Sequence, residues 1–131
     1  MDFIKQFLTA GIIMGVIDAI WLTTSSKFYK THIGQLLLEK PNFGAAVAFY
    51  IIYVIGIVVF VLSPALAKDS WQYAFGYGSL FGLVAYATYD LTNLATLKGF
   101  SPTVVAVDLL WGTILTGTVA TLSFLVIKAW L

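Results

Sequence analysis

The chain has 131 residues, of which 60% are hydrophobic, 16% are aromatic and only 10% are charged. This composition is typical of a membrane protein with a single domain. The formal net charge is only +1, and the seven basic residues are all lysines placed singly, so the sequence offers no basic face for nucleic acid. The absence of cysteine excludes disulfides and thiolate metal sites, and a single histidine cannot build a polyhistidine metal site.

Four segments are long and apolar enough to cross a bilayer, which takes about 20 mainly apolar residues. They cover residues 4–25, 43–67, 71–97 and 103–129. Short connections with Ser, Gly or Pro join the second segment to the third and the third to the fourth. The sequence therefore predicts an all-α fold, in which residues 1–131 form one transmembrane domain built as an antiparallel four-helix bundle.

The first apolar segment is longer than the ~7–15-residue core of a signal peptide, and no small-residue cleavage site follows it. We therefore interpret it as a spanning helix. The connection after it is the only long one in the chain. Residues 27–38 mix lysines with aromatic and aliphatic side chains, as a short helix in the membrane interface would, and an ordered loop is the alternative.

Two pairs of glycines stand four residues apart, Gly11 with Gly15 and Gly78 with Gly82. Small residues at this spacing let two helix backbones approach closely where lipid supplies no hydrophobic drive. Asp18 shares a helical face with the first pair and Asp90 shares one with Gly82. Both aspartates are therefore expected to face neighbouring helices rather than lipid.

Asp18, Asp90 and Asp108 interrupt the first, third and fourth apolar segments, and no lysine lies in the core of these segments. An ionised aspartate at the centre of a membrane helix costs about 2.5–3.5 kcal/mol, and such a residue indicates a functional site by default. Because the helices alternate in direction, all three aspartates fall roughly 8–10 Å below one interface, at about 1.5 Å per residue. We therefore expect them to approach one another.

Aromatic and amide side chains fall at the same depth as the three aspartates. The predicted ligand-binding set is Asp18, Trp21, Tyr50, Tyr53, Tyr86, Asp90, Asn93, Asp108 and Trp111. The alternative role for the carboxylates is helix pairing, and for the two tryptophans it is anchoring at the interface. A hard metal ion is a less favoured ligand, since no paired-aspartate motif for magnesium is present. No metal and no cofactor is assigned.

The pattern D-x-x-W occurs twice, at Asp18 to Trp21 and at Asp108 to Trp111, in helices that run in opposite directions. Such a match is the kind of trace that an inverted duplication leaves in transporters. The match covers four residues and by itself predicts no chemistry.

Three strings resemble a family of small bacterial membrane proteins known only as a domain of unknown function. They are AFYIIYVIG at residues 48–56, YATYDLTNLATL at 86–97 and DLLWGTILTG at 108–117. The resemblance covers nearly the whole chain. It implies four helices and a multi-pass location in the bacterial inner membrane, but it supplies no activity and no catalytic residues.

Three hypotheses for function follow. The first is a protein that binds or transports a small cation, a proton or an amphipathic molecule, with carboxylates supplying charge and aromatic faces supplying cation–π contacts. The second is a membrane enzyme that acts on lipid, with an aspartate as general base and a tyrosine as acid. The third is a structural accessory subunit. We expect membrane lipids to surround the protein. The sequence leaves open whether the protein forms a homo-oligomer.

Overall fold

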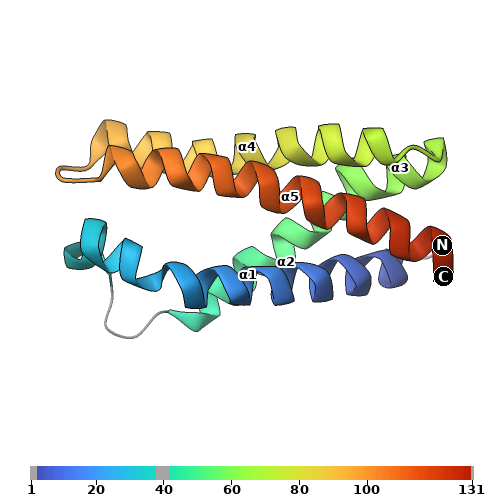
Figure 1. Ribbon diagram of the computed structural model, residues 1–131, viewed down its shortest axis with the longest axis horizontal. Helices are drawn as coiled ribbons and strands as arrows, with labels where there is room; N and C mark the ends of the chain where they lie inside the picture. Colours follow the sequence, from blue (N-terminus) through green and yellow to red (C-terminus); the bar gives the residue numbers. More distant parts are fainter. Residues whose placement is uncertain (1–2, 38–41, 131) are drawn as a thin grey trace.

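The computed structural model describes residues 3–37 and 42–130, and within them it contains helices and no strand. The elements are α1 (Phe3–Ile33), η1 (Gly34–Leu36), α2 (Phe43–Ile57), η2 (Val58–Leu62), α3 (Ser63–Lys68), α4 (Trp71–Thr96) and α5 (Pro102–Trp130). α2, η2 and α3 follow one another without a break, so four long helices result, as predicted. α1 begins and α5 ends at the same end of the bundle (Figure 1).

The ends of the helices follow local sequence signals. Asn42 caps α2 by accepting a hydrogen bond from the N–H of Ala45, at 3.1 Å, and Ser70 caps α4 by accepting one from the N–H of Tyr73, at 3.0 Å. These residue types satisfy backbone N–H groups that have no partner in the first turn of a helix. Between α3 and α4 the chain turns at Asp69, whose φ of 51° is left-handed. The α4–α5 turn contains Gly99, with a φ of 76°.

The first helix is longer than predicted. α1 runs to Ile33, about 46 Å at 1.5 Å per residue, and only then gives way to the short η1 turn. The predicted interfacial helix at residues 27–38 is therefore largely a continuation of α1, and residue 38 lies outside the described residues. The physical reason is that no glycine or proline stands between the predicted end of the helix at residue 25 and Gly34. Lys30 and His32 in the last turn also suit the negative end of the helix dipole.

α4 and α5 form the tightest helix pair; they run side by side from the turn that joins them, and their ribbons separate toward the end of α5 (Figure 1). At Gly82 an added Cβ would meet the carbonyl oxygen of Gly112, and at Gly78 it would lie 2.9 Å from the Cβ of Ala120. The predicted contact role of the Gly78 and Gly82 pair is therefore present. In α1, a Cβ added at Gly15, a member of the first glycine pair, would lie 3.0 Å from the hydroxyl oxygen of Tyr50 on α2.

The packed apolar core lies toward the end of the bundle where α1 begins and α5 ends. Its fully buried members include Ala10 and Met14 from α1, Ile57 and Leu62 from the α2–η2 segment, and Val119 from α5. Toward the other end, α2 runs obliquely to α1 (Figure 1). Among the side chains that the sequence singled out, Tyr53 belongs to the apolar core, and Tyr50, Tyr86 and Trp111 pack against it.

Three helical segments are long and apolar enough to span a membrane by length and composition: Phe3–Leu36, Phe43–Lys68 and Pro102–Trp130. α4 is as long as a span but carries more polar residues, among them Asp90 and Asn93. It lies alongside α5 in the bundle, and its crossing of the membrane stays a prediction. Many large apolar side chains on the outer faces are exposed, as expected where lipid is the surrounding solvent.

Candidate functional site: an acidic, aromatic cavity

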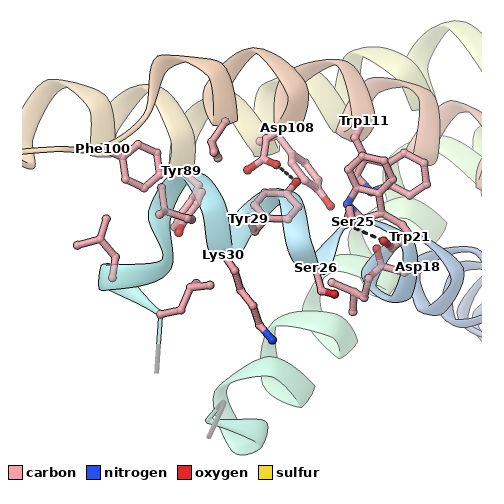
Figure 2. A pocket seen from close by; sticks show the side chains of 16 residues that line it. Asp18, Trp21, Ser25, Ser26, Tyr29, Lys30, Tyr89, Phe100, Asp108 and Trp111 are labelled. Atoms are coloured by element: carbon pink, nitrogen blue, oxygen red, sulfur yellow. Dashed lines mark hydrogen bonds between the residues drawn. The ribbon is translucent and has the colours of Figure 1, made fainter. Parts of the chain in front are cut away.

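A cavity of about 790 Å³ lies between the second half of α1 with η1 and the adjoining halves of α4 and α5. This volume is in the range of ~300–1,000 Å³ that is usual for small-molecule sites. The lining side chains are two carboxylates, six aromatic rings, five aliphatic groups and three other polar groups (Figure 2). They are Asp18, Asp108, Trp21, Tyr29, Tyr86, Tyr89, Phe100, Trp111, Leu22, Ile33, Leu36, Leu37, Val104, Ser25, Ser26 and Lys30.

The cavity is elongated along α1, because its lining extends from Asp18 to Ile33 on that helix. These fifteen residue steps correspond to about 22 Å. Asp18 lies at one end with the two tryptophans, and Phe100 from the α4–α5 turn lies at the other. Such a shape suits a molecule that is longer than a hydrated ion.

Asp108 on α5 is held by α1. The hydroxyl of Tyr29 donates a hydrogen bond to Oδ1 of Asp108 across the cavity (Figure 2). A hydrogen bond to a charged acceptor is stronger than one between neutral groups. This bond therefore orients the carboxylate and fixes the second half of α1 against α5.

The two tryptophans of the repeated D-x-x-W pattern meet in the cavity wall. Trp21 and Trp111 stack with their ring centroids 4.3 Å apart and their planes 10° from parallel. Asp18 lies beside Trp111 and interacts with its side chain, yet the indole Nε1 of Trp111 is buried without a hydrogen-bond partner in the described part of the chain. A buried donor of this kind is costly unless something accepts from it.

Asp90 lies on α4, which packs against α5, the helix that carries Asp108. It is fully buried at the α4–α5 contact, it does not line the cavity, and its side chain interacts with that of Asp108. Neither of its carboxyl oxygens has a hydrogen-bond partner among the residues described. A fully buried carboxyl group without any partner is rare in proteins and calls for a specific explanation.

The three aspartates form no ion pair with a lysine of the described chain. Among residues 3–37 and 42–130, no ion pair involves Asp18, Asp90 or Asp108, and the ion pair of Lys128 with Asp69 lies at the opposite end of the bundle. Lys30 lines the cavity, but its side chain is exposed and its ammonium group points away from Asp108 (Figure 2). The described residues contain no cluster of three or more His, Cys, Asp or Glu side chains suited to a metal ion.

The predicted ligand-binding residues divide into two groups. Asp18, Trp21, Tyr86, Asp108 and Trp111 line the cavity, whereas Tyr50, Tyr53, Asp90 and Asn93 do not. The hydroxyl of Tyr50 donates to the carbonyl of Gly11 at 2.8 Å, and that of Tyr53 is 2.6 Å from Oγ1 of Thr116. Both tyrosines thus join helices, and ligand binding by any of the nine stays a prediction.

Sequence reasoning missed Tyr29, the partner of Asp108. The signal was available, because Ser25 and Tyr29 follow Asp18 by seven and eleven residues and therefore continue the same face of an uninterrupted helix. Ending the first helix near residue 25 hid that continuation. Tyr89 and Phe100 gave no comparable signal, because nothing in the sequence places them beside α1.

The fold and this cavity define the protein as an α-helical membrane protein with an acidic, aromatic cavity between its helices. The chain belongs to the family described as "Predicted membrane protein (DUF2177)", which matches residues 3–125. This match confirms the resemblance carried by the three sequence strings. No curated protein matches the chain, and no solved structure matches it.

Proposed function

We propose that the protein binds an amphipathic organic cation in the cavity between α1 and the α4–α5 pair. The observation that carries the proposal is that Asp18 and Asp108, which form no ion pair within the described chain, line one aromatic cavity of about 790 Å³. Unpaired carboxylates in a low-dielectric site attract a positive charge strongly. The ligand would bring to these carboxylates the positive charge that no ion pair within the described chain provides.

The aromatic walls favour an organic cation over a bare metal ion. A cation placed near the face of Trp or Tyr gains about 0.5–2 kcal/mol from the ring quadrupole. The aliphatic side chains of Ile33, Leu36 and Leu37 line the far end, where an apolar part of the ligand would lie. The cavity reaches the surface along six exposed lining residues: Leu22, Ser26, Lys30, Leu36, Leu37 and Tyr89. Transport of the bound molecule is a further step of the same proposal, as is location in a bacterial inner membrane.

One observation favours a second candidate, an enzyme that acts on lipid. The hydrogen bond from Tyr29 to Asp108 places a phenol and a carboxylate together in the cavity, and such a pair could serve as general acid and base. Turnover of a lipid by the purified protein, lost in Asp108→Asn, would establish this function instead. Stable co-purification with one fixed partner, without ligand binding, would favour an accessory subunit.

The direct test compares two probes of nearly the same shape and opposite charge. Tetraphenylphosphonium and tetraphenylborate are offered to the purified protein in a neutral detergent, and binding is measured by equilibrium dialysis against protein-free micelles. We expect saturable binding of the phosphonium cation at one site per chain and no saturable binding of the borate anion. Equal binding of both probes would show simple partitioning into apolar surface and would overturn the proposal.

A further inference from the structure

We propose that Asp90 and Asp108 together hold one proton in the ligand-free protein and release it to the solvent when an organic cation enters the cavity. This inference rests on the proposed function, which it deepens by coupling ligand binding to a proton. It assigns a role to Asp90, a fully buried carboxyl group that does not line the cavity.

The first argument is the geometry of the pair. The two carboxyl side chains lie close enough for a hydrogen bond between them, but two ionised carboxylates are both acceptors and cannot form one. An ionised Asp90 beside an ionised Asp108 would have no donor to accept from, and neither oxygen of Asp90 has a hydrogen-bond partner in the described chain. A single proton on Asp90 supplies the missing donor.

The surroundings of the pair point the same way. From α1, the hydroxyl of Tyr29 already donates to Asp108, which stabilises the charge on Asp108 rather than on Asp90. Tyr29 and Tyr89 are the other titratable groups that interact with Asp90, and both are neutral phenols near pH 7. No lysine of the described chain forms an ion pair with either carboxyl group.

Helix packing holds the two groups in place. At Gly112, one turn after Asp108, an added Cβ would collide with the ring of Tyr86, one turn before Asp90, and Asp90 itself is fully buried. Asp90 therefore has little room to move away from Asp108. Asp108, by contrast, reaches both the buried carboxyl group and the cavity. Asp108 therefore couples a positive charge in the cavity to the protonation of Asp90.

The exchange balances in charge. In the ligand-free protein the pair carries one proton and one negative charge. When the cation approaches Asp108, its positive charge favours the ionised form of Asp90, so the O–H bond of Asp90 breaks and the proton leaves through the cavity. One positive charge enters and one leaves, and the net charge at this buried place stays the same.

The proton count is measured by titrating the detergent-solubilised wild type with tetraphenylphosphonium in two buffers that differ in ionisation enthalpy. We expect about one proton released per bound cation near neutral pH. The affinity should then rise with pH by up to about tenfold per unit, because protons compete with the ligand. Binding without any proton release overturns this inference and leaves the proposed function standing, whereas no binding overturns the proposed function itself.

The assignment to Asp90 is tested with Asp90→Asn, whose amide donates to Asp108 as a protonated carboxyl would. We expect this variant to bind the cation without releasing a proton and with an affinity that no longer changes with pH. Asp69→Asn, at the exposed ion pair with Lys128, is the matched control and should release the proton as wild type does. If Asp90→Asn still releases one proton per cation, the proton belongs elsewhere. If the variant does not fold, the proton count in wild type still decides whether exchange occurs.

Discussion

Trp21 and Trp111 lie face to face, 4.3 Å between ring centroids, although they come from helices at opposite ends of the chain. Each follows an aspartate by three residues, and α1 and α5 run in opposite directions (Figure 1). The two copies of the pattern therefore contact each other where α1 packs against α5, and Asp18 of the first copy lies beside Trp111 of the second. The arrangement places an aromatic pair in the wall of the cavity that both carboxylates line.

The tryptophan pair should contribute to binding of an aromatic cation. We expect Trp111→Leu to weaken tetraphenylphosphonium binding roughly 2- to 30-fold, corresponding to a cation–π contribution of about 0.5–2 kcal/mol. Trp111→Phe should recover part of the loss because it keeps an aromatic face. Trp130→Leu, at a side chain that is 78% exposed, is the control. An unchanged affinity in Trp111→Leu would place the ligand away from this wall.

The two cavity carboxylates should each be required for cation binding. Asp18→Asn and Asp108→Asn keep the shape of the side chain and an acceptor for hydrogen bonds but remove the charge. Each should weaken binding at least about tenfold, which is about 1.4 kcal/mol. Thermal unfolding in detergent checks that both variants are folded. Wild-type affinity in both variants would mean that the carboxylates only pair helices.

The tyrosines outside the cavity should affect stability and not binding. Tyr53→Phe removes the hydroxyl that lies 2.6 Å from Oγ1 of Thr116, and Thr116 is fully buried. A buried polar group left without its partner costs about 1–3 kcal/mol. We expect a lower unfolding temperature with unchanged cation affinity. A loss of cation affinity in a folded Tyr53→Phe variant would show that Tyr53 takes part in binding after all.

The contact between α4 and α5 at Gly82 should not accommodate any larger side chain. An alanine Cβ at Gly82 would collide with the carbonyl of Gly112 and lie 2.7 Å from Oγ1 of Thr116. We expect Gly82→Ala to destabilise the protein by about 1–3 kcal/mol, as overpacking usually does. Gly76→Ala is the matched control on the same helix, because a Cβ there meets nothing within 4 Å. Similar unfolding temperatures for the two variants would contradict the described packing.

The helices could be predicted from the sequence because each is an apolar run bounded by residues that break or cap helices. The exception is the end of α1, where the mixture of aromatic and basic residues predicts a separate interfacial segment but α1 continues to Ile33. Polar but helix-compatible residues do not end a helix. Gly34 is the first glycine or proline after residue 25, and α1 ends just before it. That error also hid Tyr29.

The site could be predicted only in part, because depth along a helix is readable from the sequence whereas rotation about its axis is much less so. Depth placed Asp18 and Asp108 at one level, and both line the cavity. The same argument placed Tyr50 and Tyr53 there, but their hydroxyls turn to Gly11 and Thr116. Those directions depend on how the helices cross, which no residue pattern in α2 encodes.

The most direct test of the central claim is to locate the cation in a crystal of the protein grown with tetraphenylarsonium. The arsenic atom gives an anomalous signal that identifies the ligand without ambiguity. We predict one anomalous peak inside the cavity, between α1 and α5 and close to Asp18 and Asp108, and its loss in the Asp18→Asn, Asp108→Asn double variant. Ordered arsenic only on the lipid-facing surface, with the cavity empty, would contradict the account.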